Sequence, residues 1–495
     1  MIRRDFIKGV GMLGVAALAP IATPAQRLTG ATRDLATTQL TGRVTANGKP
    51  LANVAVTDGV NVVQTNAKGE YTLLTNKTTA FVYISPPAGH AFPHEHSVTN
   101  FFRVIDHKQK AFKADFALQP LTGSDDKHAF VVWADPQIQT KEDAQKLLTE
   151  SAPDLKTLVD SYPAGTLFHG IGCGDLVWDK FDLFADYKQA IAQSSIPFFQ
   201  VIGNHDMDLE ARTDEGSSKT FEQNFGPSYY SFNRGQIHYI VLDDVFFVGA
   251  DKRYIGYLDE RQLSWLEQDL KFVRPGATIV VNLHIPSNTG KRRRYQEDSD
   301  DMGGVVLNRE RLYTLLKPYT VHIMSGHTHV NENWSENNIM EHNHGAVCGA
   351  WWTGPICSDG TPSGYGVYEV DGSNLKWYYK STGRPREHQL RAYVPGRHRV
   401  YHDQVCINVW NWDKAWKIEC LADGKSLGSP EQRTGQDPWS VELHEGATKP
   451  ATRRWVEPSL TDHLFFIKPP EGTRVFEVVC TDRFGNRYTD KLTLA

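Results

Sequence analysis

The chain has 495 residues, which is enough for two to four domains with sizeable hydrophobic cores. Its 53 Lys and Arg residues stand against 58 Asp and Glu residues, and the formal net charge is −5. Because there is no basic bias, we expect neither nucleic acid nor an anionic membrane as the main partner.

Residues 1–25 have the pattern of an export signal. Arg3 and Arg4 precede an apolar stretch from Val10 to Ala22 that is too short to span a bilayer. The string RRDFIK, which begins at Arg3, resembles the twin-arginine signal. An ordinary secretory signal or an amphipathic N-terminus is the alternative interpretation. The pattern predicts an exported protein, located in the bacterial periplasm, whose mature form has no membrane span.

Residues 38–120 are typical of short antiparallel strands, because apolar and polar residues alternate between turn signals such as Asn47-Gly48 and Asp58-Gly59. The pattern G-x-V…G-x-P-L-x-x-V-x-V…T-x-x-x-G-x-Y resembles the carboxypeptidase-regulatory-like β-sandwich. His90, His94 and His96 lie in a Pro-rich loop, and we interpret them as exposed or packing residues rather than metal ligands.

From 128 to about 383, strand patterns alternate with helical ones, which predicts an α/β layered domain after a polar linker at 121–127. One helix is indicated by Leu155, Leu158 and Val159. A second is indicated by apolar residues from 263 to 273 and by an N-cap at Asp259. The charged segment 291–302 has little to bury, so it is either a disordered loop or a mobile rim of a site.

Residues 384–495 return to strand patterns, which predicts a second β-sandwich. Its Trp410, Trp412 and Trp416 are interpreted as core or interdomain packing. None of the six cysteines has C-x-x-C spacing, which argues against a structural zinc site. Three of them lie in this last segment and allow one disulfide of undetermined pairing, namely Cys406, Cys420 and Cys480.

Six apolar runs in the central segment break into polar residues where each strand is expected to end. In open α/β sheets, ligands bind beyond the carboxyl ends of the strands. We therefore expect the side chains at these ends to form one site. They are Asp135 and Gln137, Asp175, Asn204 and His205, Asp243 and Asp244, His284, and His327 and His329.

Carboxylate, imidazole and amide donors together suit Mn²⁺, Fe²⁺, Zn²⁺ or Mg²⁺, and they are too many for a single ion. The donor set predicts two divalent ions, about 3.5–4 Å apart and bridged by one carboxylate. Only Asp135 and Asp175 are certain carboxylate ligands, so the loaded site would be positive and would attract a phosphate ester.

The motifs GDLVWD, GNHD, NLHIP and GHTH resemble those of the calcineurin-like metallophosphoesterases, in that family's order and over residues 128 to about 383. The resemblance implies a four-layered α/β sandwich between two β-sandwich domains, as in three-part bacterial members. It implies that Asp175 bridges the ions and that a metal-bridging hydroxide attacks phosphorus. His205 would stabilise the transition state or protonate the leaving alkoxide. The implied ligands are Asp135, Gln137 and His329 for the first ion, and Asn204, His284 and His327 for the second.

One departure from the family pattern is Gln137, which stands where D-x-H usually places a histidine. We expect weaker binding at the first site and a preference for Mn²⁺, Fe²⁺ or Mg²⁺ over Zn²⁺. Trp351, Trp352 and Asp359 lie near the position of the family's substrate wall, with simple packing as the alternative.

Five further side chains near these motifs receive weaker interpretations. Asp179 is interpreted as a turn residue rather than a ligand. Asp243 and Asp244 either orient a ligand histidine or cap a strand. His342 and His344 receive no role.

The combined prediction is an exported dinuclear phosphoesterase that hydrolyses phosphomonoesters or phosphodiesters. Its substrate would be a small-molecule, glycan or lipid phosphate ester, with nucleotides and phospholipid headgroups included. Two alternatives stay open: an extracellular binding or adhesion protein with a vestigial centre, and a metallohydrolase that acts on a pyrophosphate bond.

Overall fold

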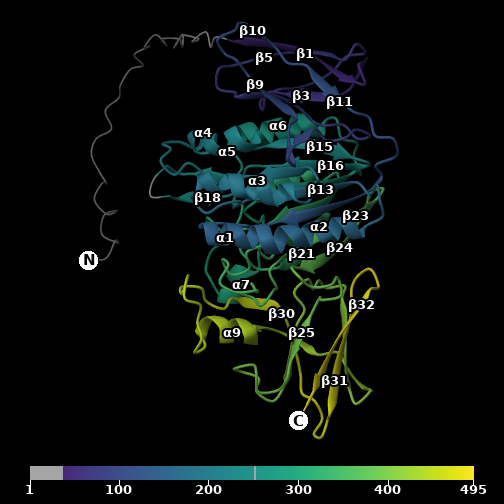
Figure 1. The fold of residues 1–495 in the computed structure, drawn as a ribbon, viewed down its shortest axis with the longest axis vertical. Helices are drawn as coiled ribbons and strands as arrows, with labels where there is room; N and C mark the ends of the chain where they lie inside the picture. The colour runs from purple at the N-terminus through teal and green to yellow at the C-terminus, as the bar shows by residue number, and fades with distance from the viewer. Residues whose placement is uncertain (1–36, 250–251, 495) are drawn as a thin grey trace, which may run out of the picture. The chain divides into compact units, whose positions relative to one another are not determined.

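The computed structural model describes residues 37–249 and 252–494 (Figure 1). The predicted export signal at 1–25 lies outside these residues. Within the described ranges, no helix combines the length and apolar character that a membrane crossing requires.

The first described segment forms two small sheets built from short strands. The larger sheet is centred on β1 and contains β1 (Thr38–Ala46), β2 (Lys49–Pro50), β5 (Glu70–Thr75), β10 (Ala111–Lys113) and β11 (Phe116–Leu118). The smaller sheet has the order β4-β3-β6-β9 and contains β3 (Ala55–Thr57), β4 (Val62–Gln64), β6 (Phe81–Ile84) and β9 (Phe102–Val104). His94 and His96 are exposed and His90 is half-buried, in agreement with their interpretation as exposed or packing residues.

The central segment contains a seven-stranded mixed sheet with the order β24-β23-β12-β13-β14-β8-β7. Its strands are β7 (His94–Glu95), β8 (Val98–Thr99), β12 (Lys127–Trp133), β13 (Phe168–Cys173), β14 (Phe198–Val201), β23 (Gly364–Asp371) and β24 (Asn374–Ser381). Strands β12, β13 and β14 are parallel, so their carboxyl ends lie at one edge. Val98 in β8 pairs with Phe198, so the N-terminal segment completes this sheet.

A second, six-stranded sheet has the order β15-β16-β19-β20-β22-β21. Its strands are β15 (Tyr230–Arg234), β16 (Ile237–Val241), β19 (Thr278–Asn282), β20 (Thr320–Ser325), β21 (Glu332–Glu336) and β22 (Ile339–Asn343). The parallel set β16, β19 and β20 supplies the other three polar strand ends. The six strand ends of the sequence pattern are therefore divided between two sheets. A separate hairpin joins β17 (Val245–Phe247) to β18 (Tyr254–Gly256).

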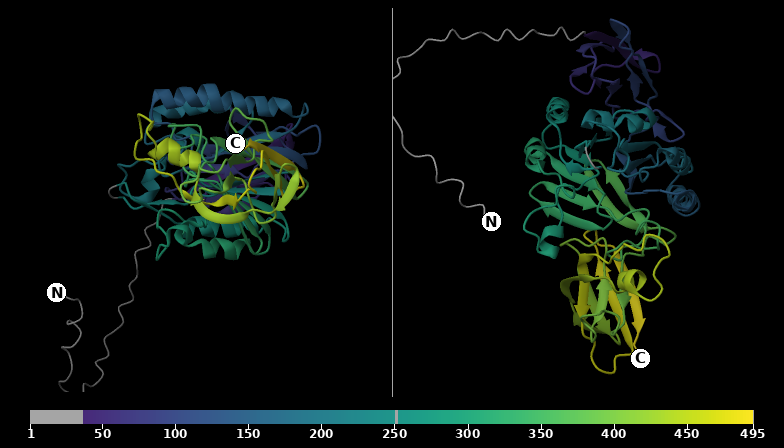
Figure 2. Two further views of the ribbon diagram at one scale, coloured as in Figure 1. Left: turned by 90° about the horizontal axis from the view of Figure 1, so that it is seen from below. Right: turned by 90° about the vertical axis from the view of Figure 1, so that its left-hand side faces the viewer.

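The two central sheets pack face to face through aromatic side chains. Phe199 of β14 stacks on Phe232 of β15 with ring centroids 3.7 Å apart, and Phe130 of β12 meets Tyr239 of β16 at 5.5 Å. Helices lie on the two outer sides, as Figure 2 shows in its left view. The long apolar runs of these strands are explained by burial on both faces.

On one side, Leu155 of α2 and Tyr187 of α3 belong to the same buried cluster as Trp133 of β12. On the other side, Trp265 of α6 and Leu312 of α8 pack against the second sheet. The described helices are α1 (Lys141–Lys146), α2 (Ala152–Ser161), α3 (Phe184–Ala192), α4 (Asp214–Ser217), α5 (Lys219–Phe225), α6 (Glu260–Leu270), α7 (Lys291–Tyr295), α8 (Arg309–Leu316) and α9 (Pro438–Glu445). A π-helical turn (Leu147–Ser151) joins α1 to α2, and a 3₁₀ turn (Phe181–Leu183) precedes α3.

Two helix predictions are confirmed. Leu155 and Leu158 are buried in α2, and Asp259 caps α6 by accepting a hydrogen bond from the backbone N–H of Gln262 at 2.6 Å. The charged segment 291–302, for which a disordered loop was one expectation, contains helix α7. Arg294 in α7 pairs with Glu332 at 3.0 Å and with Asp462 at 3.2 Å, so residues distant in sequence hold the segment.

The C-terminal segment forms two four-stranded antiparallel sheets that share a hydrophobic cluster. One contains β25 (Arg391–Tyr393), β26 (Val405–Asn408), β29 (Glu431–Gln436) and β30 (Leu460–Ile467), and the other β27 (Lys417–Ala422), β28 (Lys425–Gly428), β31 (Val475–Thr481) and β32 (Arg487–Thr493). Trp410 and Trp416 are buried and Trp412 is partly buried, which fits packing. All six cysteines are buried free thiols, so the disulfide considered among the last three does not form.

Candidate metal centre

The donor side chains lie in the short loops that follow the parallel strands, and several of these loops hold left-handed backbone. Asp135 has φ 50°, Asp175 has φ 49°, and His327 and His329 have φ 68° and 54°. Non-glycine residues rarely adopt this conformation, and those that do are enriched at active and ligand-binding sites. Glycines supply the close approaches: a Cβ on Gly203 would lie 2.3 Å from Oδ1 of Asp175.

One group of donors gathers around Asp175, His284 and His327, whose ligand atoms all lie within 4.8 Å of one another. Nε2 of His284 lies 3.3 Å from Oδ1 of Asp175 and 3.1 Å from Oδ1 of Asn204. Nδ1 of His284 is 3.1 Å from the carbonyl oxygen of Cys173. If Nδ1–H donates to that carbonyl, Nε2 keeps its lone pair for a metal ion.

A second group joins Asp135, Asp175 and His329, with the same 4.8 Å limit. Nε2 of His329 lies 3.4 Å from Oδ1 of Asp135, and Nδ1 of His329 lies 3.8 Å from the thiol of Cys348. Asp135 also accepts the backbone N–H of His327 at 2.9 Å, which ties the two loops together. Asp175 is the member common to both groups.

Gln137 tests whether these residues fit metal ions. Its Nε2 donates to Oδ2 of Asp175 at 2.9 Å, whereas its Oε1 is buried and accepts no hydrogen bond. A buried acceptor without a donor is costly. A cation bound between Gln137, Asp135 and His329 would satisfy it. The residues present therefore fit the divalent ions predicted from the donor chemistry.

His205 lies beside this centre and is oriented by Asp179. Its backbone N–H donates to Oδ1 of Asp175 at 2.9 Å, and its Nδ1 lies 2.8 Å from Oδ1 of Asp179. The backbone N–H of Asp179 donates back to the carbonyl oxygen of His205 at 3.1 Å. His205 belongs to neither donor group, so its ring is available for proton transfer.

Charges within the centre are strongly coupled. Burial opposes ionisation of Asp175, but the positive charges of His284 and His205 hold the pKa of that carboxyl below its usual range. Burial lowers the pKa of His284, but the carboxylates of Asp175 and Asp135 outweigh it and raise the pKa to about 10. Burial and the charge of His284 lower the pKa of His327 to about 4. The field of the two carboxylates thus favours positive charge, as a cation site requires.

Two buried carboxylates support the loops from behind. Asp206 accepts the backbone N–H groups of Leu176, Val177 and Gly203 at 3.0–3.1 Å. Burial and the charge of Asp175 raise the pKa of Asp206 to about 7. Asp244 accepts the backbone N–H groups of His284 and Ile285, both at 3.2 Å, so it fixes a ligand loop through the main chain rather than through the imidazole ring.

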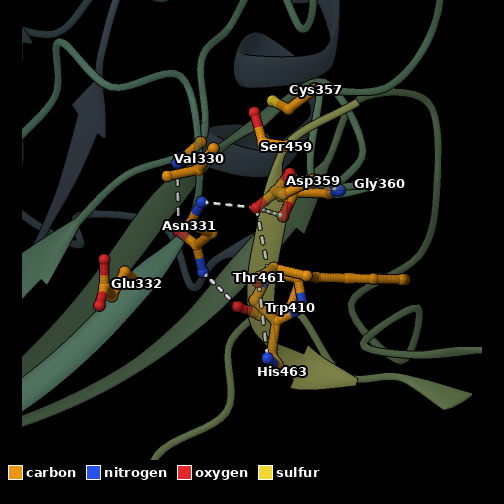
Figure 3. A network of polar contacts seen from close by, with 12 residues as sticks. Val330, Asn331, Glu332, Cys357, Asp359, Gly360, Trp410, Ser459, Thr461 and His463 are labelled. Carbon is orange, nitrogen blue, oxygen red and sulfur yellow. Dashed lines mark hydrogen bonds and ion pairs between the residues drawn. The ribbon is translucent and has the colours of Figure 1, made fainter. Parts of the chain in front are cut away.

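The three suggested wall residues lie in different environments. Trp351 stacks on His329 with centroids 4.2 Å apart, whereas Trp352 is buried and donates its indole N–H to the carbonyl of Pro136 at 3.0 Å. Asp359 is fully buried and accepts the backbone N–H of Asn331 at 2.9 Å, and it lies 3.0 Å from Nε2 of His463 (Figure 3). Asp359 therefore links the loop after His329 to the C-terminal sheets.

The two unassigned histidines are buried and belong to neither donor group. His344 contacts the hydroxyl of Tyr368 at 2.8 Å, and His342 contacts His322 at 3.1 Å. Sequence reasoning missed Asp206 and Cys348 and gave Asp179 only a turn role. Only Asp206 has a signal in the sequence that could have identified it, because it directly follows His205 in the GNHD motif.

Two mixed sheets with outer helices, whose parallel strand ends meet in one cluster of Asp, His, Asn and Gln, have the architecture of a metallophosphoesterase. The chain belongs to the calcineurin-like phosphoesterases. The family's N-terminal model matches residues 38–121, its catalytic model residues 143–331 and its C-terminal model residues 341–488. The catalytic match includes the donors from Asp175 to His329, while Asp135 and Gln137 precede it.

Curated relatives resemble only a part of the chain. Purple acid phosphatase 15 of Arabidopsis thaliana is 30% identical over 167 residues, which cover 31% of this chain and 28% of that protein. Serine/threonine-protein phosphatase CPPED1 of Rattus norvegicus is 28% identical over 179 residues, which cover 34% and 55%. The chain thus spans about a quarter to a half of the length of these relatives.

Among solved structures, purple acid phosphatase PPD1 from yellow lupin seeds aligns over 67% of both chains with 15% identity and a TM-score of 0.37. A 5'-nucleotidase from Candida albicans aligns over 52% of this chain and 51% of that chain, with 13% identity and a TM-score of 0.32.

Proposed function

We propose that this chain is an exported phosphoesterase that hydrolyses phosphomonoesters or phosphodiesters at a centre of two divalent metal ions. One observation carries the proposal: Asp175 is shared by two groups of converging donors, which is the arrangement that a bridged pair of ions requires. The buried Oε1 of Gln137 accepts no hydrogen bond, and an ion held with Asp135 and His329 would give it a partner, which also supports the proposal.

Asp135, Gln137 and His329 would hold one ion together with Asp175. Asn204, His284 and His327 would hold the other. When bound, the ions would activate the attacking water and screen the charge that develops on the phosphoryl group. Because the amide oxygen of Gln137 is a poorer zinc ligand than an imidazole nitrogen, we propose Mn²⁺, Fe²⁺ or Mg²⁺ ahead of Zn²⁺.

His205 would act on the leaving group. Asp179 holds Nδ1 of this imidazole, so Nε2 is the nitrogen from which a proton can pass to the departing alkoxide oxygen. Asp179 also stabilises the charged imidazolium that this role needs. The bond to Asp175 through the backbone N–H of His205 fixes the distance of the ring from the centre.

The wider proposal includes location and architecture. The RRDFIK string supports export to the periplasm, and the helix–sheet–sheet–helix packing supports a four-layered sandwich flanked by two β-sandwich domains. An exported enzyme of this kind would meet glycan, lipid or nucleotide phosphate esters as substrates.

The proposal is tested with mature protein stripped of metal and reloaded with Mn²⁺. Hydrolysis of p-nitrophenyl phosphate is compared with hydrolysis of bis-p-nitrophenyl phosphate, with Asp175→Asn as the matched control. We expect metal-dependent turnover that the variant lacks, and the faster substrate separates monoester from diester chemistry. Metal-independent turnover, or equal turnover by Asp175→Asn, would overturn the assignment.

Two other outcomes would favour the alternatives. Turnover of inorganic pyrophosphate alone would indicate a pyrophosphate-bond hydrolase. Neither turnover nor bound metal would indicate an adhesion or binding protein with a vestigial centre.

A further inference from the structure

Three indole side chains form a continuous border beside the candidate metal centre. Trp351 stacks on His329 with ring centroids 4.2 Å apart, and Trp178 lies 5.4 Å from His205. Trp455 joins the two, because its ring lies 4.6 Å from that of Trp351 and 6.0 Å from that of Trp178. The border therefore runs from a candidate ligand of the first ion to the candidate proton donor.

Trp455 reaches this border from the C-terminal segment, and Arg453 anchors it there. Nη1 of Arg453 donates to the carbonyl of Trp351 at 2.6 Å and to Oδ1 of Asp143 at 3.0 Å. The Arg453 guanidinium also lies 5.6 Å from the centre of the Trp178 ring. The pair of Arg453 with Asp143 is nearly buried, so truncating one partner would be strongly destabilising. The contacts of Arg453 therefore hold the segment that carries Trp455 in one position.

Packing alone does not explain Trp455. Trp352 is the packing residue of this region, because it is 7% exposed and its indole N–H is bonded to a backbone carbonyl. Trp455 is 54% exposed although its neighbours hold it in place. A large apolar side chain that is anchored yet left open to solvent is typical of a binding surface.

We propose that Trp455, together with Trp178 and Trp351, binds a flat aromatic ring carried by the leaving alcohol of the phosphate ester. The inference rests on the proposed function, since it takes His205 as the group that protonates the leaving oxygen. Because Trp178 contacts His205, the leaving alcohol would lie on the indole side of the centre. Nucleosides and aryl-substituted alcohols have such a ring, whereas glycerol and simple alkyl alcohols do not. Aromatic side chains stack on such rings with little dependence on their substituents.

The test compares two esters of primary alcohols that differ in the ring: 2-phenylethyl phosphate and n-butyl phosphate. The corresponding methyl diesters replace them if the enzyme prefers diesters. We expect the wild-type protein to favour the phenylethyl ester, and Trp455→Ala to lower this preference, measured as the ratio of kcat/KM values, by about tenfold. Trp455→Phe keeps an aromatic ring and should restore most of the preference. Glu457→Gln, an exposed change in the same segment, should leave both kcat/KM values as in the wild type.

A binding measurement separates recognition from catalysis. By calorimetry, 2-phenylethylphosphonate should bind Trp455→Ala about tenfold more weakly than the wild type. Equal use of both esters by the wild type, or an unchanged preference in Trp455→Ala, would overturn the inference alone. No turnover of either ester by the metal-loaded wild type would overturn the proposed function and the inference with it.

Discussion

The contact between Asp179 and His205 allows a sharp test of how the proton donor is held. Asp179→Ala removes the carboxylate that accepts from Nδ1 of His205 at 2.8 Å. It leaves the backbone bond from the N–H of Asp179 to the carbonyl of His205, so the loop itself should persist. Asp179→Asn keeps an acceptor oxygen but removes the negative charge.

The expected fall in kcat follows from the strength of the hydrogen bond between Asp179 and His205 and from the exposure of the two side chains. A hydrogen bond to a charged group contributes about 1.5–3 kcal/mol, equivalent to a factor of about 10–150. Both side chains are about a quarter exposed, so solvent screening moves the value toward the lower end. We expect kcat to fall about 10- to 50-fold in Asp179→Ala and about 3- to 10-fold in Asp179→Asn. KM should change little, because the bond matters most while the leaving oxygen takes its proton.

The assay is a double-mutant cycle with His205→Ala, which alone should lower kcat by about 10²–10⁴-fold while metal content is retained. If Asp179 acts through His205, the double variant should be no slower than His205→Ala. Asp182→Ala, an exposed change three residues along, is the control. Full additivity of the two losses, or loss of metal in Asp179→Ala, would refute the positioning role.

Three further predictions concern the shared ligand Asp175, the glycine that lies against it and the N-cap of helix α6. Asp175→Asn should weaken binding of both ions by more than about 100-fold, because both donor groups lose their shared carboxylate. Equilibrium dialysis with metal analysis measures this loss. A variant that keeps both ions at wild-type affinity would contradict the assignment. Gly203→Ala should lower Tm and metal content, since the added Cβ would lie 2.0 Å from the backbone nitrogen of Asp175. The control is Gly123→Ala, whose added Cβ would meet no atom within 4 Å, so this variant should behave as the wild type. Asp259→Ala should lower the free energy of unfolding in urea by about 1 kcal/mol through loss of the α6 cap, and an unchanged denaturation midpoint would show that the cap is dispensable.

The sequence predicts those parts of the fold that depend on neighbours in the chain. Apolar runs identify the central strands, and the spacing of Leu155 and Leu158 identifies α2, because burial imposes a local period. The pairing of Val98 with Phe198 is not predictable in this way, since it joins residues a hundred positions apart. The order of segment 291–302 is likewise set by Glu332 and Asp462, which no local pattern connects to Arg294.

The same distinction applies to the candidate site. Each proposed ligand lies within four residues of the end of a strand, so its position has a local signal even before the strands are assigned to two sheets. The role of Asp179 was missed because the deciding contact is with His205, on the next strand's loop. Trp455 had no signal at all, because its neighbour Trp178 lies in a distant segment and only the folded chain brings them together.

Backbone strain gives a further reason to regard the centre as functional rather than vestigial. The left-handed conformation costs about 1–2 kcal/mol for a residue with a Cβ, and Gln137, His327 and His329 all adopt it. Glycine would hold the same loops at lower cost, so their stability does not require these side chains. The backbone N–H of Gln137 donates to the carbonyl of Asp175 at 2.7 Å, and that of His327 donates to Asp135, so the strained loops are held by the very residues that would share the ions. The left-handed residues are thus the ones that carry the donor atoms, which favours the proposed metal centre over a vestigial one.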